Sequence, residues 1–303
     1  MTKVDGEAGG LHVSHWPLIR LAVYAGASVA TIVAGTIVTR LLVPPEPSPW
    51  HDLALLKNLI LPIALFSIYA GLVRVMERRK AREVDFKTGM PALLFGILIG
   101  SAIIGLTVAA LSALGMVQIV SRTGFAGLER ELLVLMVTTM TEELLFRVIL
   151  FAVLEEIMGS LAAIVISAAA FGLAHFTNPG ATPFALFALS IELGVMLALA
   201  YMLTRNIWMA VGIHAGWNFT QGFVLGSLNS GQQHPHSYFQ TTLSGPDFFT
   251  GGLFGLEGSV VCLGLSIAVS LVFLALILRR RRWLSLRLRV RAARSDFAGA
   301  QGV

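Results

Sequence analysis

The chain has 303 residues, of which 56% are hydrophobic and only 13% are charged, and its mean hydropathy is +0.79. These values exclude an ordinary soluble domain of this size and predict an all-α, polytopic integral membrane protein. The formal net charge of +5 does not indicate a nucleic-acid partner, because the basic residues lie at the ends of apolar runs, as membrane topology requires.

Apolar runs long enough to cross a bilayer follow one another along the chain. One crossing helix needs about 20 such residues. The sequence offers these runs at 21–43, 53–75, 91–116, 132–154, 161–176, 183–203, 207–225 and 259–278. We therefore expect about eight transmembrane helices around a polar intramembrane cavity.

The segments between these runs complete the organisation of the chain. We expect a polar N-terminal segment at 1–20, N-terminal transmembrane helices over 21–128, a transmembrane core over 129–225, a polar exterior loop at 226–258, the last helix at 259–278 and a basic tail at 279–303. Basic residues gather after the second run and in the tail, so we predict that both segments and both termini are cytoplasmic. Within the tail, 284–291 interleaves apolar residues with arginine and is expected to lie on anionic lipid.

The fourth run contains charged residues in the middle of an otherwise apolar stretch. Glu142, Glu143 and Arg147 fall near the centre of the predicted span, where a charge costs about 2.5 to 3.5 kcal/mol and normally serves a function. Glu143 and Arg147 are four residues apart, so they can form an ion pair on one helix face. Glu142 is five residues from Arg147 and cannot share that face, so it is a candidate general base. The alternative is a purely structural cluster of charges that holds helices together.

Two more runs each carry a histidine. His175 lies near the end of the fifth run, and His214 lies in the seventh run, four residues before Asn218 and so on the same helix face. Polar groups on separate spans are satisfied most simply by one another or by trapped water. The other histidines are expected to be exposed or interfacial; they are His12, His15, His51, His234 and His236.

The chemistry of such a cluster is limited. A carboxylate and an imidazole can hold and deprotonate water, while a second imidazole and a carboxamide can donate hydrogen bonds to an oxyanion. Zn²⁺ bound by Glu142, His175 and His214 is the alternative. The sequence has no HExxH pair and asparagine is an unusual zinc ligand, so the metal-free mechanism, with no cofactor, is favoured.

At these positions the sequence closely resembles the CPBP family of intramembrane proteases, also called the CAAX protease and bacteriocin-processing or Abi family, to which the type II CAAX prenyl endopeptidase belongs. The motifs EExxxR, FxxxH and HxxxN stand here in order as Glu142-Glu143-Leu144-Leu145-Phe146-Arg147, Phe171-Gly172-Leu173-Ala174-His175 and His214-Ala215-Gly216-Trp217-Asn218. By motif, the resemblance covers about 132–223, so 129–225 is expected to be the catalytic core.

The resemblance implies a glutamate-dependent endopeptidase within the bilayer. Glu142 would activate water with His175 as its partner, and His214 and Asn218 would stabilise the oxyanion. Glu143 and Arg147 would be supporting residues, and Phe171 is expected to serve packing. The substrate would be a membrane-associated peptide or protein, which need not be prenylated, because the chain looks like a bacterial cell-membrane protein. The oligomeric state is left open.

Among the acidic residues outside the motifs, Glu192 and Glu257 lie in or at the end of predicted spans. Glu192 in the sixth run could line the cavity, orient His175 or His214, or be structural, whereas Glu257 is expected to be interfacial. By a rise of about 1.5 Å per residue, Glu142 lies near mid-membrane while His175 and His214 fall toward opposite ends of their spans. The helices must therefore be shifted, tilted or kinked for the site to assemble.

Two other classes of function use similar residues. Glu, His and Arg on several spans also occur in transporters and proton relays, but no inverted repeat or pair of broken helices is visible in the sequence. The other class is a non-catalytic immunity or scaffold protein that keeps the cluster for helix association.

Overall fold

The computed structural model describes residues 16–42, 51–234 and 236–285. The predictions for the first fifteen residues, with His12 and His15, and for the arginine-rich tail beyond residue 285 lie outside this part of the chain.

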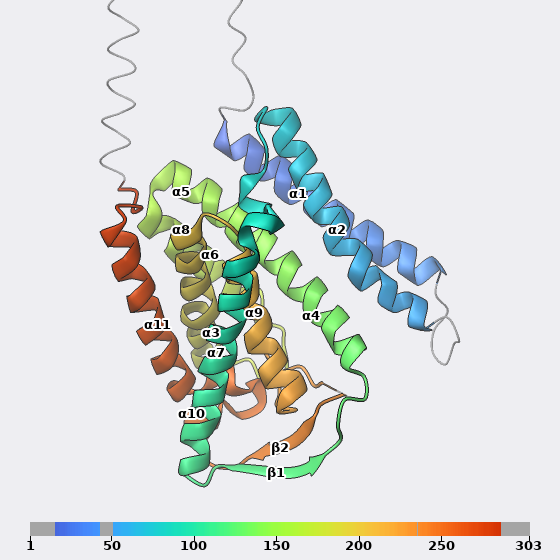
Figure 1. Cartoon of the computed structure of the whole chain (residues 1–303), viewed down its shortest axis with the longest axis vertical. Helices are drawn as coiled ribbons and strands as arrows, with labels where there is room; N and C mark the ends of the chain where they lie inside the picture. Colours follow the sequence, from blue (N-terminus) through green and yellow to red (C-terminus); the bar gives the residue numbers. More distant parts are fainter. Residues whose placement is uncertain (1–15, 43–50, 235, 286–303) are drawn as a thin grey trace, which may run out of the picture.

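Helices make up most of the described structure (Figure 1). Three stand alone at the start of the chain, and several later ones join end to end into continuous rods. In chain order the helices are α1 (Pro17–Leu42), α2 (His51–Met76), α3 (Phe86–Ala113), α4 (Leu128–Glu143), the π-helical η3 (Leu144–Phe151), α5 (Ala152–Met158), α6 (Ser160–Leu173), α7 (Pro183–Leu189), the π-helical η4 (Ser190–Val195), α8 (Met196–Thr204), α9 (Trp208–Asn218), the π-helical η5 (Phe219–Val224) and α11 (Val260–Arg279).

Five of these helices, within the described residues, are long and apolar enough to cross a membrane. They are Pro17–Leu42, Lys57–Met76, Phe86–Ala113, Pro183–Thr204 and Val260–Arg279. The rod at 128–158 carries the motif charges, and α6 has only 14 residues. The chain is therefore a multi-pass, essentially all-α membrane protein, while the count of eight crossing helices stays a prediction.

Local sequence explains where several helices begin. Thr182 accepts a hydrogen bond from the backbone N–H of Ala185, and Pro183 fills the first position of α7. Ser259 accepts in the same way from Val261 at the start of α11. Capping side chains satisfy backbone donors that a helix leaves free, and proline is tolerated at the first position.

Close glycine packing joins α3 to α9. A Cβ on Gly96 would lie 2.5 Å from the carbonyl oxygen of Met209, and Cβ atoms on Gly100, Gly212 and Gly216 would collide with the facing backbone in the same way. The small-xxx-small spacing of Gly212 and Gly216 thus marks a real helix contact, met by the same spacing on α3. This contact fixes the position of His214, which lies between the two glycines.

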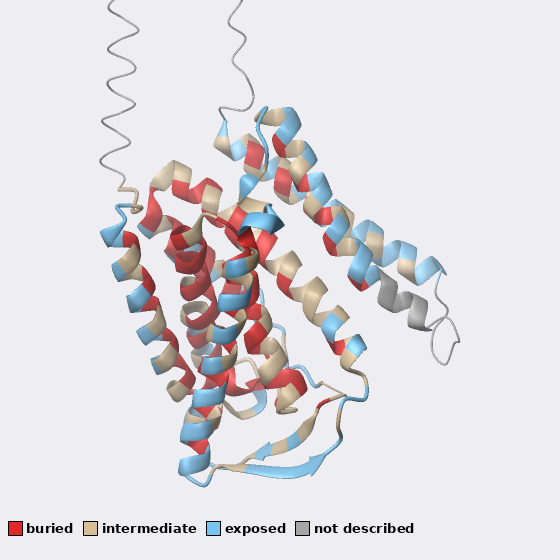
Figure 2. Cartoon of the chain, viewed as in Figure 1, coloured by how far each residue is buried: buried red, intermediate tan, exposed pale blue. Residues whose placement is uncertain are grey.

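Burial divides the bundle (Figure 2). Every residue of α8 from Met196 to Leu203 is buried, and most of α9 is buried as well. The helices α1 and α2 instead expose much of their apolar surface, including Val29, Ile37 and Ile60. The central helices therefore form the protein core, and the outer ones offer their apolar faces to lipid.

A small antiparallel sheet was not predicted. Strand β1 (Val117–Arg122) pairs with β2 (Phe239–Leu243) from Val117 opposite Leu243, with an irregularity between Ile119 and Ser121. The two strands lie at the end of the bundle away from the α2–α3 connection (Figure 1).

Residues 226–258, here called the cap segment, also differ from the expected polar loop. Besides β2 they form α10 (Asp247–Thr250), η6 (Gly252–Phe254) and η7 (Leu256–Gly258), and Phe254, Leu256 and Glu257 are fully buried. Glycines with positive φ, such as Gly251 and Gly255, allow the tight turns that fold this polar stretch onto the bundle. The segment is thus an integral part of the fold.

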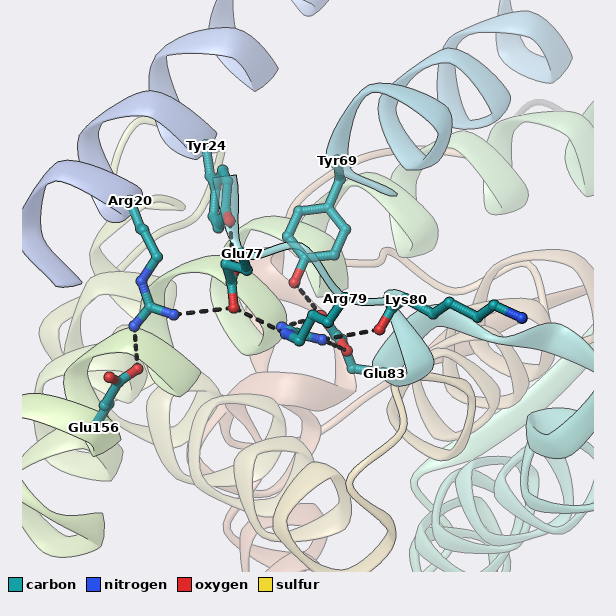
Figure 3. A network of polar contacts seen from close by, with 8 residues as sticks. All are labelled: Arg20, Tyr24, Tyr69, Glu77, Arg79, Lys80, Glu83 and Glu156. Carbon is teal, nitrogen blue, oxygen red and sulfur yellow. Dashed lines mark hydrogen bonds and ion pairs between the residues drawn. The ribbon is translucent and has the colours of Figure 1, made fainter. Parts of the chain in front are cut away.

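A network of charged residues closes the opposite end of the bundle (Figure 3). Arg79 binds Glu77 at 2.8 Å and donates to both oxygens of Glu83, at 2.8 and 2.9 Å. Arg20 of α1 pairs with Glu77 at 3.1 Å and with Glu156 of α5. We call this group, with Tyr24, Tyr69 and the backbone oxygen of Lys80, the Arg79 network. It ties α1, α2, α5 and the α2–α3 connection together.

Candidate active site

The first motif lies where an α-helix becomes π-helical. Glu142 and Glu143 are the last residues of α4, and Arg147 lies in η3, where the N–H of Ala152 bonds to the carbonyl of Arg147, five residues back. The guanidinium Nε of Arg147 is 3.0 Å from Oε2 of Glu143, and both side chains are buried. The predicted ion pair is therefore present. π-helical segments are rare in proteins, and those that occur often lie at functional sites.

Arg147 also joins two further rods to this helix. Its NH2 group donates to the backbone oxygen of Leu193 in η4 at 2.5 Å. Its guanidinium carbon lies 4.6 Å from the ring centre of Phe171 in α6, a favourable cation–π distance. Arg147 thus compensates the charge of Glu143 and holds three rods together.

His214 lies between the two glutamates. Its Nδ1 is 2.8 Å from Oε1 of Glu143, and its Nε2 is 3.9 Å from Oε2 of Glu142. A carboxylate accepts hydrogen bonds, so we assign the proton of this contact to Nδ1 of His214. The expected pairing of Glu142 with His175 differs from this arrangement: among the contacts of the described residues, the histidine beside Glu142 is His214. Its position on α9 could not be read from the spacing within one helix.

His175 is held by its own helix end. Its Nδ1 lies 2.9 Å from the carbonyl oxygen of Phe171, which leaves Nε2 for other contacts. The ring of Phe171 is fully buried, 5.1 Å from the ring of His175 and 6.1 Å from that of His214. Phe171 therefore packs between the two histidines and Arg147, in agreement with the packing role expected for it.

One cavity of about 380 Å³ brings the motif residues together. Its walls include Glu142, His175, His214 and Asn218. Oε2 of Glu142 and Oδ1 of Asn218 are buried and have no hydrogen-bond partner among the described residues. His175, in the turn after α6, and His214, on α9, thus meet at one cavity although their positions along the predicted spans differ.

A second histidine–carboxylate pair in the same cavity was missed. Nδ1 of His234 is 2.9 Å from Oε2 of Glu131, and both residues line the cavity. His234 is therefore not the exposed loop residue that was one of the two expectations for it, since its side chain is only 18% exposed. Nothing in the spacing of these residues, 103 positions apart, could have revealed the contact.

The two other acidic residues are both fully buried. Glu192 does not line the cavity and has no hydrogen-bond partner among the described residues, so the structure brings neither His175 nor His214 to it. Glu257 accepts hydrogen bonds from the backbone N–H and the hydroxyl of Ser230, the latter at 2.8 Å. The expected interfacial position of Glu257 is wrong, because the cap segment folds over it. Burial raises the pKa of the Glu257 carboxyl above its usual range.

The fit to a zinc ion can be tested on the ligand atoms. Nε2 of His214 and Oε2 of Glu142 are close enough to share a small ligand, but a catalytic zinc site needs three protein ligands. Within the part of the chain that the structure describes, no three His, Cys, Asp or Glu side chains are gathered as metal ligands. As placed, Glu142, His175 and His214 do not complete such a site.

Comparison with known proteins agrees with the motifs. Residues 130–220 match the family model described as Type II CAAX prenyl endopeptidase Rce1-like. No curated protein and no solved structure matches the chain. The matched range contains every motif residue from Glu142 to Asn218. Over residues 130–220, the chain is therefore similar to the CPBP family of CAAX-type membrane proteases, which supports the assignment made from the motifs.

Proposed function

We propose that the protein is an intramembrane endopeptidase that uses a water molecule activated by Glu142 to cut a membrane-associated or lipidated peptide or protein. One observation carries this proposal. Two neighbouring glutamates have opposite surroundings: Glu143 is paired with Arg147 and His214, whereas Glu142 faces the cavity with an oxygen that has no partner among the described residues. Glu142 has only the 3.9 Å contact of its Oε2 with Nε2 of His214 among the ion pairs of the described residues, and such a carboxylate beside a cavity is suited to accept a proton.

The reaction follows from the placement of the donors and acceptors. Glu142 takes a proton from water, and the hydroxide attacks the scissile carbonyl carbon. His175, on the same cavity, orients that water through its free Nε2. The proton on Glu142 then passes to the leaving amine as the carbon–nitrogen bond breaks.

His214 and Asn218 stabilise the negative charge that forms on the carbonyl oxygen. Nδ1–H of His214 is bound to Glu143, so His214 presents Nε2 to the cavity. When Nε2 also carries a proton, it can donate to the oxyanion, beside the amide N–H of Asn218. Glu143 and Arg147 thus act through His214 and position it.

The direct test is cleavage of a quenched-fluorescent peptide library by the full chain in liposomes. The wild type should cut, and Glu142→Gln should lose activity because it keeps the shape of the side chain but removes the base. Glu129→Gln is the matched control, since Glu129 is an exposed acid on the same helix. A strong chelator should have no effect. Peptide cleavage that persists in Glu142→Gln would overturn the mechanism, and loss of activity with the chelator would favour zinc.

The orientation in the membrane is part of this proposal. The basic connection after α2 and the arginines that follow α11 lie at the same end of the bundle (Figure 1). Positively charged segments favour the cytoplasmic side. We therefore propose that this end, with both termini, lies on the cytoplasmic side of a bacterial cell membrane and that the cap segment lies on the outer side. Accessibility of a cysteine introduced at Lys80 or at Gln240 to a membrane-impermeant thiol reagent tests the assignment, and labelling of Lys80→Cys from outside would contradict it.

A further inference from the structure

A second cavity adjoins the candidate active site. It has a volume of about 560 Å³ and is built entirely from residues 226–253 of the cap segment. This volume is within the range of about 300 to 1,000 Å³ that is usual for ligand pockets. We call this second cavity the annex. His234 lines both the annex and the cavity that holds Glu142, so it stands between them.

His234 is fixed from two sides. Its Nδ1 bonds to Glu131 at the start of α4, and its ring lies against Gly222, where a Cβ would approach the ring atoms to 2.7 Å. Gly222 belongs to η5, which directly follows Asn218. The wall between the two cavities is therefore built onto the same helices that carry the motif residues.

The linings of the two cavities differ in chemistry. The active-site cavity has large apolar walls that include Val134, Leu135 and Phe223. The annex is instead lined by several hydroxyl and amide side chains, among them Ser227, Gln240, Thr241 and Thr250, together with glycines and three leucines. Among the described residues, its lining contains one carboxylate, Asp247, and no lysine or arginine.

We propose that the annex is a substrate subsite for a polar, basic peptide segment, so that the enzyme cuts close to where an apolar stretch gives way to such a segment. This inference rests on the proposed function, because the apolar side of the substrate must occupy the cavity of Glu142. The peptide passes His234 in an extended form. The hydroxyl and amide side chains of the annex form hydrogen bonds with the peptide backbone, and Asp247 attracts a lysine or arginine side chain of the peptide.

The first arm of the test measures binding without cleavage. The full chain carrying Glu142→Gln, in nanodiscs, is titrated with three fluorescent peptides that share one apolar sequence and carry a Lys-Ser-Lys flank, a Glu-Ser-Glu flank or no flank. The basic flank should bind about threefold to fivefold more tightly than the acidic one, as expected for one exposed charge pair, and the difference should shrink in high salt.

Substitution of Asp247 identifies the source of the preference. Asp247 is exposed, so Asp247→Asn should fold normally and lose the preference, and Asp247→Lys should reverse it. Binding of the unflanked peptide should not change in either variant. Arg130→Gln, on α4 and outside the annex lining, serves as the charge-changing control.

The second arm measures cleavage of the same peptides by the chain with Glu142 intact, and it separates the two proposals. A flank preference that is absent, or that survives in Asp247→Lys, overturns the annex assignment even if the wild type cuts all three peptides. A preference that depends on Asp247, combined with no cleavage of any peptide, upholds the annex as a peptide site and overturns the proposed protease function.

Discussion

The Arg79 network and the candidate active site are built from the same kinds of residue, yet they are paired differently. In the Arg79 network, each of the glutamates Glu77, Glu83 and Glu156 meets at least one arginine (Figure 3). In the site, Glu142 meets no arginine, and its Oε2 borders a cavity without a hydrogen-bond partner among the described residues. Because its carboxylates are paired with arginines, the Arg79 network holds helices together. Because Glu142 lacks such a partner, the candidate active site can bind a small molecule such as water and exchange a proton with it.

Burial separates the two clusters as well. The Arg79 side chain is 43% exposed, whereas Arg147 is 1% exposed and Glu143 is fully buried. An exposed ion pair contributes about 0 to 1 kcal/mol, but removing one partner of a buried pair costs about 3 to 5 kcal/mol. Equivalent substitutions in the two clusters should therefore have different consequences.

The largest expected difference is in catalysis. Glu142→Gln should lower kcat by about 10²- to 10⁴-fold, which is the contribution of a general base, without lowering the melting temperature. Glu83→Gln makes the same chemical change within the Arg79 network and should leave kcat within about twofold of the wild type. Peptide cleavage and thermal unfolding of both variants check this prediction, and equal losses of kcat would remove the functional distinction between the clusters.

The next effect is on stability. Arg147→Met leaves Glu143 buried without its cation and should reduce the free energy of unfolding by about 3 to 5 kcal/mol. Arg79→Met should cost less, about 1 to 3 kcal/mol, because the Arg79 side chain is 43% exposed although its partners Glu77 and Glu83 are mostly buried. Chemical denaturation in detergent gives both values. The double variant Glu143→Gln/Arg147→Met should recover part of the loss, since it buries no unpaired charge; no recovery would mean that packing of Arg147 on Phe171 is the main contribution.

The smallest effect is a dependence of stability on pH. Burial alone would raise the pKa of Glu77, but hydrogen bonds from Tyr24 and Arg79 and the nearby charges of Arg79 and Arg20 bring it below its usual range. A depressed carboxyl pKa adds stability above the unfolded pKa of about 4.3, and this stability is lost as the pH falls through the folded pKa. The melting temperatures of wild type and Glu77→Gln should therefore differ near neutral pH and converge in acid. A constant difference at every pH would contradict this account.

Interactions within one helix were the part of the site most accessible to prediction. The pair of Glu143 and Arg147 depends on a spacing of four residues within one helix, and it could be read from the sequence. The partner of Glu142 could not, because His214 arrives from another rod. The packing of α9 against its neighbouring helices, including α3, brings His214 near the glutamates.

The cap segment shows a second limit. Its polar composition is that of an exposed loop, and composition does not reveal that turns at Gly251 and Gly255 would bury Glu257 under the chain. For the same reason, the contact between His234 and Glu131 could not be predicted from the sequence. The helical class and the motif residues depend on local pattern, whereas the cavity walls depend on long-range folding.

The π-helical η3 lies between the glutamates of the candidate active site and Glu156 of the Arg79 network. Its exact number of residues fixes the angle about the helix axis between these side chains. Glu142 and Glu156 belong to one continuous rod, and 144–151 lies between them. Deleting one residue there, such as Ile149, would turn the following part of the rod by about 100° relative to the first. Glu155 and Glu156 would then leave Arg205 and Arg20 while Glu142 and Glu143 kept their places. A shortened chain could thus retain all three motifs and still lose the ion pairs that hold the helix of Glu142 to its neighbours.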